Sequence, residues 1–571
     1  MLPVKAYATI IRVYSPLEIE SSAYAVRRRI RPATKIAQTL RRNTMRFARA
    51  IVVTTAGCLV LSSDAAPTRA DEASLVRPAA YLAALPKPRF KAGHTLPRLT
   101  RYGWALPLDA RKELAESWHY ALEFGTVSAG ACYVTDSVVA RLDDPTSDES
   151  QLAAWALAEP KKVPLSVICT RELPTDNPPE TWTRDPRGRP LEALSRSPDG
   201  TEWHSGRGKL FSPESPDSVW REAGELRAVP LRALVARGLP IAIVLNGGEY
   251  GLGVPGFARS FWEQDPRIVA AKGTRSWADY ISERKGRYEK IIADVVRAAV
   301  PQRDLYVYYT AGGGTLRNKG PGSDDWGYSF DAMQSVSDLP CNEIYYRHFN
   351  DGFRGRLDLL TLALNAAAKE IAAGRPHSYN WISAGWPRRT PQQDAGPDAP
   401  PDEADLDRWT GFLTCYFMAG MLGCNAGYYA YPPEGFAASF PAEQPPHWLR
   451  QLTATSYVQA RMSHVEDLLR EGDLLPGPSR HALSKDDPAY EFPTGDTTAR
   501  VLVRKSRQRA EWLITAWAAD GPDRDVTVAV PELGEVTIRC TKTATVCRAV
   551  LAENRPHYEF IPVQTLENRR R

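Results

Sequence analysis

The feature that most constrains the fold of this chain is an alternation of eight short apolar runs with longer helical patterns, from about residue 99 to 472. Strands that are buried on both faces read as continuous apolar runs, and their alternation with helices predicts a parallel sheet. The runs lie at 101–107, 130–135, 164–172, 240–249, 305–310, 342–349, 378–386 and 425–432. The helical patterns lie at 109–123, 147–158, 216–237, 275–299, 357–373, 405–422 and 447–471.

Eight such units favour an α/β fold of the (β/α)8 TIM-barrel type over residues 95–475. The alternative is an open doubly wound sheet, but no Gly-rich dinucleotide-binding fingerprint follows the first run. The pattern changes after residue 476 to short β-branched runs joined by turns, which predicts an antiparallel β-sandwich over 476–571. Its strands are expected at 499–506, 510–518, 525–531, 535–541, 545–551 and 557–562.

The net charge of +5 is unevenly distributed along the 571 residues. Residues 1–70 hold twelve Lys and Arg against three Asp and Glu, whereas residues 71–571 hold 60 against 64. The body of the protein is therefore mildly acidic. Because a nucleic-acid-binding domain needs a basic surface, we do not expect nucleic acid as a partner.

Residues 45–70 have the layout of a secretory signal peptide. Met45 precedes the basic residues Arg46 and Arg49, an apolar stretch covers 50–61, and Ala70 stands before a plausible cleavage point. Residues 1–44 are interpreted as a longer leader or as a mis-set start. We therefore expect an exported protein, periplasmic or secreted. A lipoprotein anchor at Cys58 is the less favoured alternative, because the apolar stretch continues past it.

No other stretch approaches 18 uncharged apolar residues, so no membrane span is expected. The eight cysteines form no CxxC pair, which argues against a zinc framework, and we expect no cofactor. A turn at Thr543–Ala544 would place Cys540 opposite Cys547 in a hairpin. A disulfide and two unbonded cysteines are equally compatible with that arrangement.

In a barrel, the functional residues lie at the carboxyl ends of the strands. The predicted strands place several carboxylates there, together with polar and aromatic side chains. These are Arg171, Glu172, Asn246, Glu249, Arg347, His348, Asp351, Trp386, Tyr431 and Glu434. Carboxylates around one opening suit glycoside hydrolysis, which needs one acid and a second carboxylate as nucleophile or base. The 15 Trp and 24 Tyr can pack on sugar rings, although many such residues serve as core anchors.

The architecture of residues 95–571 resembles the clan A glycoside hydrolases: a signal peptide, an eight-unit barrel, a Glu after strand four in an Asn-containing turn, and a C-terminal β-sandwich. In that clan the acid/base Glu directly follows the Asn, whereas Gly247 and Gly248 separate Asn246 from Glu249 here. The clan's nucleophile is a Glu at the end of strand seven. The seventh run of this chain, SYNWISAGW, holds no carboxylate.

We assign Glu249 as the general acid. Asp351, after strand six, is the first choice for the second carboxylate, because this placement resembles barrel glycosidases of the α-galactosidase type. Glu343 is set aside, because it stands near the start of its run. The expected function is hydrolysis of an oligo- or polysaccharide; the alternative is a non-catalytic barrel protein that binds carbohydrate. A third reading, a barrel hydrolase or lyase of another class, would be favoured by a metal at the barrel opening. The oligomeric state cannot be inferred from the sequence.

Overall fold

The structure is a computed structural model, and the residues that it describes lie within Ser74–Arg571. The described residues are 75–86, 95–102, 127–128, 134–169, 181–196, 202–209, 212–247, 262–309, 336–345, 357–383, 385–386, 402–403, 406–427, 439–478 and 489–564. Within them, no helix has the length and apolarity to cross a membrane.

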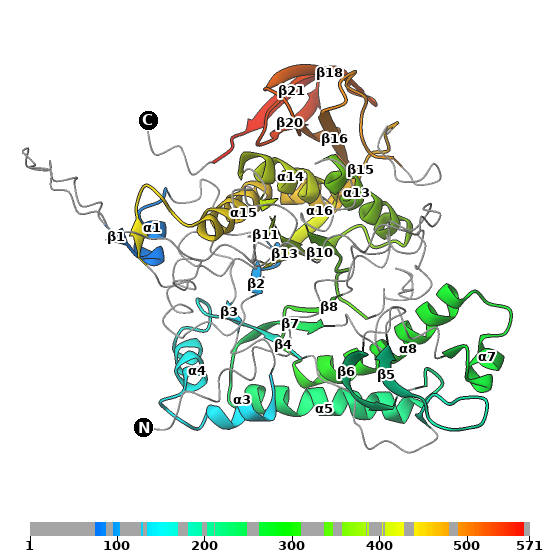
Figure 1. Cartoon of the computed structure of the whole chain (residues 1–571). Helices are drawn as coiled ribbons and strands as arrows, with labels where there is room; N and C mark the ends of the chain where they lie inside the picture. The colour runs from blue at the N-terminus through cyan, green and yellow to red at the C-terminus, as the bar shows by residue number, and fades with distance from the viewer. Residues whose placement is uncertain are drawn as a thin grey trace, which may run out of the picture. The chain divides into compact units, whose positions relative to one another are not determined.

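Eight parallel strands form two four-stranded sheets (Figure 1). The first sheet holds, in spatial order, β3 (Val127–Ser128), β4 (Leu165–Ile168), β7 (Ile241–Gly247) and β8 (Leu305–Tyr309). The second holds β9 (Glu343–Tyr345), β10 (Ser378–Ser383), β13 (Met421–Gly427) and β2 (Thr100–Tyr102). The last of these strands in the chain, β13, pairs in parallel with the first, β2.

The segment before β9 connects the two sheets. The backbone N–H of Asp338 donates to the carbonyl of Tyr306 in β8 at 2.9 Å, and the N–H of Tyr379 in β10 donates to the carbonyl of Pro340 at 2.8 Å. Apolar side chains from β4, β7, β8 and β10 also share one buried cluster, here called the inner cluster. Its members are Ile168, Ala242, Ile243, Leu245, Leu305, Val307, Cys341, Tyr379 and Trp381.

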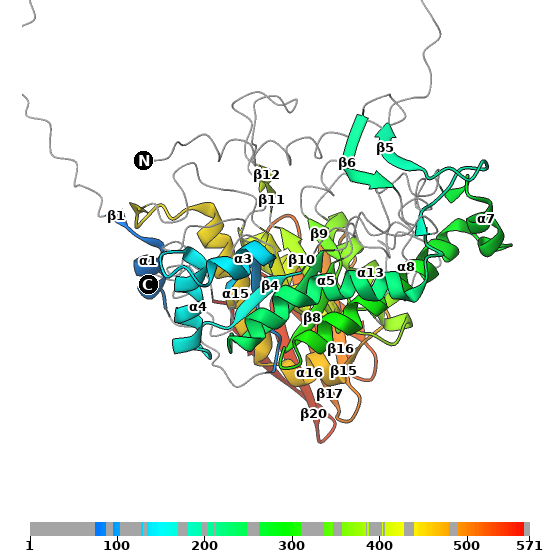
Figure 2. The same cartoon turned by 90° about the horizontal axis from the view of Figure 1, so that it is seen from below.

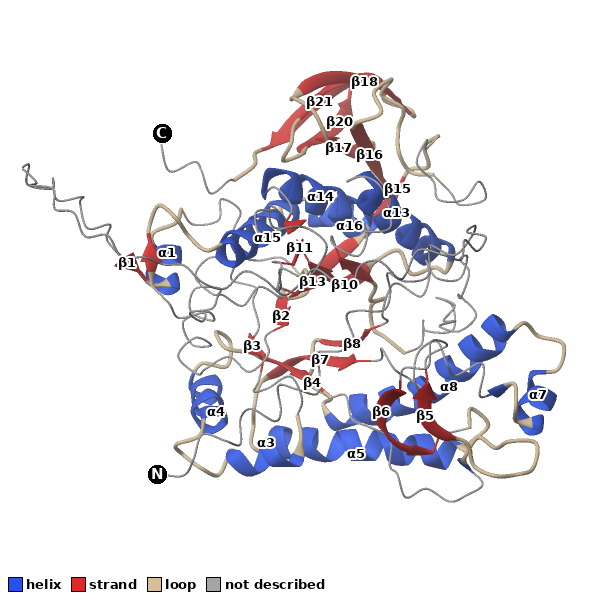
Figure 3. Ribbon diagram, viewed as in Figure 1, coloured by secondary structure: helices blue, strands red, loops and turns tan. Residues whose placement is uncertain are grey.

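Helices follow most of the strands, and their bounds agree closely with the sequence patterns (Figure 3). The agreement is closest for α4 (Asp148–Ala158), α5 (Asp217–Ala236), α8 (Trp277–Ala299) and α13 (Leu357–Ala372). The pattern at 447–471 divides into α15 (His447–Ser463) and α16 (Glu466–Glu471), while α14 (Leu406–Ala419) ends three residues early. The pattern at 109–123 lies outside the described residues.

Side-chain caps explain where several helices begin. Ser147 accepts from the N–H of Ser150 at the start of α4, and Ser276 accepts from the N–H of Asp279 at the start of α8, at 3.0 Å each. Thr135 caps the short helix α3 (Asp136–Arg141) in the same way. These bonds satisfy backbone donors that have no partner inside the helix.

Smaller elements surround this framework. They are β1 (Leu75–Val76), which pairs with β14 (Phe440–Pro441), the helices α1 (Pro78–Ala83) and α7 (Pro266–Lys272), and two antiparallel pairs. The pairs are β5 (Glu192–Arg196) with β6 (Glu202–Lys209), and β11 (Gly385–Trp386) with β12 (Asp402–Glu403).

Two strand positions differ from the sequence prediction. The second predicted strand, 130–135, follows β3 rather than coinciding with it, and Thr135 already caps a helix. The eighth strand begins at Met421 instead of residue 425, because Gly420 turns the chain directly after α14. Gly420 has a φ of 121°, and an added Cβ would collide with the carbonyl of Pro376, so only glycine fits this turn.

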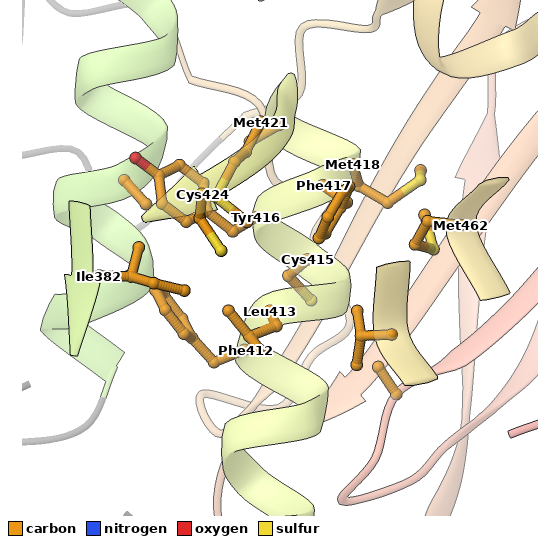
Figure 4. Close-up of a cluster of buried hydrophobic side chains, with 14 of the residues drawn as sticks. Ile382, Phe412, Leu413, Cys415, Tyr416, Phe417, Met418, Met421, Cys424 and Met462 are labelled. Carbon is orange, nitrogen blue, oxygen red and sulfur yellow. The ribbon is translucent and has the colours of Figure 1, made fainter. Parts of the chain in front are cut away.

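The helices cover the outer faces of the two sheets. Figure 2 shows α5 and α8 side by side along the first sheet, where they bury an outer cluster that includes Trp220, Ile292, Val244 and Tyr306. On the second sheet, Ile382 of β10 and Cys424 of β13 lie against Phe412 and Tyr416 of α14 (Figure 4).

The C-terminal residues form antiparallel strands at nearly the predicted positions (Figure 3). A five-stranded sheet has the order β15 (Gly472–Leu474), β16 (Ala499–Ser506), β17 (Glu511–Ala518), β20 (Thr545–Ala552) and β21 (Arg555–Ile561). A separate pair consists of β18 (Arg524–Val530) and β19 (Gly534–Cys540), and the two sheets share one apolar cluster. Because β15 joins this sheet, the antiparallel region begins slightly before residue 476.

The predicted hairpin between Cys540 and Cys547 is wrong. Cys540 on β19 pairs with Arg524 of β18, whereas Cys547 on β20 pairs with Ile514 and Phe560. The two strands therefore belong to different sheets, and both cysteines are buried free thiols. The turn between them does not close a hairpin: Ala544 adopts a φ of 61°, and its carbonyl accepts from Arg461 of α15.

Candidate functional site

The predicted site residues are concentrated in segments that the structure does not describe. Eight of the ten lie outside the described residues: Glu249, Asp351, Arg171, Glu172, Arg347, His348, Tyr431 and Glu434. Their proposed roles stay predictions. Among the described residues, no three His, Cys, Asp or Glu side chains gather as candidate metal ligands.

Asn246 lies on β7 and faces the helices. Its amide nitrogen donates to the hydroxyl of Tyr306 at 3.0 Å, and Tyr306 belongs to the outer cluster under α5 and α8. The neighbouring Leu245 belongs to the inner cluster, as the alternation of side chains along a strand requires. Asn246 therefore holds Tyr306 near the carboxyl end of β7. Its contact with a substrate stays a prediction.

A buried polar network surrounds Asn246. On α8, Glu289 accepts from the hydroxyl of Tyr308 at 2.8 Å, and the ammonium of Lys285 lies 5.7 Å from the centre of the Tyr308 ring. Burial lowers the pKa of Lys285 to about 7, although the neighbouring Glu289 opposes this shift. Burial also raises the pKa of Cys169 to about 12, so this thiol is not an activated nucleophile.

Trp386 lies outside β10. The predicted seventh strand, 378–386, ends at Ser383, and Trp386 instead pairs with Asp402 in the small β11–β12 ladder. Two other tryptophans, Trp182 and Trp262, are buried in the outer cluster of the first sheet and act as core anchors.

The inner faces of the two sheets differ in polarity near their carboxyl ends. In the first sheet, Ile168, Leu245 and Val307 are register neighbours, and all three are apolar members of the inner cluster. We call them the apolar row. In the second sheet, the register neighbours are Thr100, Asn425 and Trp381, which we call the polar row.

The alternation of side chains shows that the polar row faces inward. Leu422 and Cys424 of β13 pack outward against the helices, so Gly423 and Asn425 face the other side. Consistent with this, Gly423 lies against the ring of Tyr379, an inner-cluster residue. The register of β10 with β9 places the backbone of Glu343 next to Trp381, at the same level as the polar row.

The side chain of Asn425 is fully buried, and it finds no hydrogen-bond partner among the described residues. Its side-chain oxygen and nitrogen are both unsatisfied. Burying such an amide without partners costs about 1–3 kcal/mol, and an unsatisfied group of this kind calls for a functional explanation or a bound water. Its neighbour Thr100, by contrast, bonds the hydroxyl of Tyr379 at 2.9 Å, which in turn donates to the carbonyl of Arg98.

Sequence reasoning missed the polar row because of two strand boundaries. The predicted eighth strand began at Asn425, which put that residue at the amino end, whereas β13 reaches only two residues beyond it. Glu343 was set aside for the same reason, but β9 spans only three residues. One signal was available: Gly420 directly follows an apolar helical pattern, which is typical of a helix end.

Comparisons with known proteins give structural matches only. The sequence matches no protein-family model and no curated protein. A GH42 β-galactosidase from G. stearothermophilus aligns with a TM-score of 0.40 at 11% identity, over 66% of this chain and 58% of that one. A GH36 α-galactosidase from Geobacillus stearothermophilus gives 0.37 at 12% identity, over 80% and 54%.

A GH30 endoxylanase from Clostridium papyrosolvens gives a TM-score of 0.34 at 8% identity, over 80% of this chain and 96% of that one. The chain thus spans little more than half the length of the two galactosidases. All three solved structures are glycoside hydrolases.

Proposed function

We propose that the protein is an exported glycoside hydrolase, built from a (β/α)8 barrel over 95–475 and a β-sandwich over 476–571. The barrel is supported by the spatial order of the strands, which follows the chain from β3 to β8 in the first sheet and from β9 to β13 in the second, and by the parallel pairing of β13 with β2. The inner cluster, to which both sheets contribute, supports it further.

One observation carries the catalytic proposal: β7 and β9 are parallel strands of this arrangement, and a predicted carboxylate follows each. Glu249 comes two residues after β7 ends at Gly247, and Asp351 comes six residues after β9 ends at Tyr345. If the sheets close into one barrel, the carboxyl ends of all its strands open on the same side. Both carboxylates would then lie at one opening.

In the proposed reaction, Glu249 protonates the oxygen of the leaving sugar. Asp351 then acts as the nucleophile or as the base that activates water, and the separation between the two carboxylates decides which. Retaining enzymes need about 5–5.5 Å between them and inverting enzymes about 6.5–9.5 Å. The anomeric form of the first product, followed by NMR, distinguishes the two outcomes.

The test is turnover on a panel of oligo- and polysaccharides. We expect Glu249→Gln and Asp351→Asn each to lower kcat by about 10²–10⁴-fold while the circular dichroism spectrum stays that of the wild type. Glu225→Gln is the control, since Glu225 forms a half-exposed ion pair with Arg232 on α5. Wild-type protein that binds a glycan tightly but cleaves none would instead support the non-catalytic carbohydrate-binding alternative.

Export is part of the proposal and has its own test. The signal-peptide layout of residues 45–70 motivates it. Expressed in a bacterial host, the full chain should yield a mature protein whose amino terminus, determined by Edman sequencing, lies close after Ala70. An amino terminus at Met1 or Met45 in the cell extract would contradict it.

A further inference from the structure

We infer that Asn425 is a substrate-binding residue, whose amide bonds two adjacent hydroxyl groups of a sugar ring that packs against Trp381. This inference rests on the proposed carbohydrate function and adds a residue that the sequence did not indicate. The geometry that carries it is an inward-facing, fully buried amide without a partner, on the row two residues below the carboxyl end of β13.

The amide has its full hydrogen-bonding capacity available. An asparagine side chain offers one acceptor oxygen and one nitrogen with two donors, and none of these is used at Asn425. Buried polar groups in native proteins nearly always find a partner. A group left open inside the protein therefore points to a ligand that supplies the partner.

The neighbours of Asn425 do not compete for a ligand. The hydroxyl of Thr100 is bonded to that of Tyr379, so this side of the row is already satisfied. On the other side, Trp381 is nearly buried in the inner cluster, which makes an apolar wall. The row thus places the unpaired amide of Asn425 beside an aromatic ring.

This pairing matches the chemistry of a pyranose. Two hydroxyl groups on adjacent ring carbons can donate one hydrogen bond and accept another, which the oxygen and nitrogen of one amide complement. The C–H face of the same ring is apolar and packs on an aromatic side chain. An apolar ligand would leave the amide unsatisfied, and the first sheet offers no comparable group in its apolar row.

A contrast with Asn380 provides the control. Asn380, on β10, is equally buried, but its oxygen accepts from the N–H of Asn342 at 2.8 Å and its nitrogen donates to Ser378 at 2.7 Å. Asn380→Leu therefore removes two structural bonds and should lower Tm. Asn425→Leu removes none, so its Tm should equal or exceed that of the wild type.

The experiment compares Asn425→Leu, Asn425→Ser and Asn380→Leu in the full chain. The probes are the best glycan of the panel and the same glycan lacking one ring hydroxyl. We expect both Asn425 variants to raise Kd or KM at least about tenfold, the loss of one hydrogen-bonded contact. The deoxy glycan should bind the wild type more weakly, and the Asn425 variants should no longer distinguish it from its parent.

An unchanged Kd and KM in a folded Asn425 variant overturns the inference and leaves the amide as a host for internal water. The same holds if the variants still distinguish the deoxy glycan from its parent. A wild type that binds and cleaves no glycan overturns the proposed function as well. Glycan activity with an unchanged KM in the Asn425 variants overturns this inference alone.

Discussion

The two halves of the parallel framework differ in what covers them and in what they enclose. In the first half, α5 and α8 bury one face and carry charged residues on the other, where Arg287 of α8 forms an ion pair with Asp217 of α5. In the second half, residues 409–419 of α14 are buried without interruption. This helix packs on β10 and β13 with one side and on the C-terminal sheet with the other.

The C-terminal sheet is held against α14 by both apolar and polar contacts. The cluster shown in Figure 4 continues from α14 into Leu513, Trp517 and Val546 of the C-terminal sheet. One buried arginine joins the same two regions: Arg504 of β16 donates to the carbonyls of Met418 on α14 and Gly472 on β15 at 2.7 Å. The half with the polar row is thus also the half held by the C-terminal sheet, and we infer that this sheet supports the proposed site.

Adding one methyl group to a helix glycine should give the largest difference in the free energy of unfolding between the two halves. At Gly411 of α14, a Cβ would overlap the indole nitrogen of Trp517 and the carbonyl of Lys542. At Gly224 of α5, it would lie 2.9 Å from the Cβ of Val295 on α8, which is a milder overlap. We expect Gly411→Ala to lower the free energy of unfolding by more than about 3 kcal/mol.

Gly224→Ala should change that free energy by less than about 1.5 kcal/mol, since the helix propensity of alanine offsets part of the crowding. Urea denaturation of the two variants measures both values. Equal effects would show that the C-terminal sheet does not restrict α14 more tightly than α8 restricts α5.

Removing a buried arginine from the second half should cause the next largest loss in the free energy of unfolding. Arg461 of α15 donates to the carbonyl of Ala544 at 2.9 Å and to that of Ile561 at 2.7 Å. Arg461→Met leaves these buried oxygens unsatisfied, so we expect a loss of about 2–4 kcal/mol in the free energy of unfolding.

The matched change in the first half is Arg141→Met, which breaks an exposed ion pair with Glu149. It should cost less than about 0.5 kcal/mol, because solvent screens such pairs. Thermal and urea denaturation report the two losses. A small loss for Arg461→Met would indicate that the C-terminal sheet contributes little to the stability of α15.

The two halves should also differ in the sign of the pH dependence of their stability. In the second half, burial raises the pKa of Glu370 on α13 to about 8, so between about pH 4.5 and 8 the folded state holds a proton that the unfolded state releases. The stability contribution of Glu370 therefore falls as pH rises through this window. In the first half, Lys285 has a folded pKa of about 7. From there to about pH 10.5 the unfolded state holds the extra proton, and stability rises with pH.

Each slope is limited to about 1.4 kcal/mol per pH unit. Glu370→Gln keeps an acceptor for the amide of Asn342, which donates to Glu370 at 2.6 Å, and should remove the falling component. Lys285→Met should remove the rising one. Urea denaturation between pH 5 and 10 tests both. A Glu370→Gln profile that parallels the wild type below pH 8 would contradict the assignment.

Much of the fold could be predicted because it follows from local patterns. The helix of residues 217–236 and the six C-terminal strands carry periodicities of 3.6 and 2, which depend only on which face is buried. Strand boundaries were less predictable. A short apolar stretch such as MLGCNAG suits the end of a helix as well as a strand, and only Gly420 separates the two.

The candidate site could be predicted only in its general position, at the carboxyl ends of parallel strands. Which residues share a register level depends on pairing between strands far apart in the chain, as between Thr100 and Asn425. A shift of four residues at β13 was enough to hide Asn425. The predicted hairpin between Cys540 and Cys547 was wrong for the same reason. Their strands follow one another in the chain but belong to different sheets.

Local composition and periodicity were enough to predict the order of helices and strands, the change to antiparallel strands near residue 476, and the acidic character of the body. They could not predict that β13 pairs with β2, that Asn246 faces the helices while Asn425 faces inward, or that α14 is covered on both sides. These features arise from long-range pairing and packing, in which each side chain's environment is set by residues hundreds of positions away.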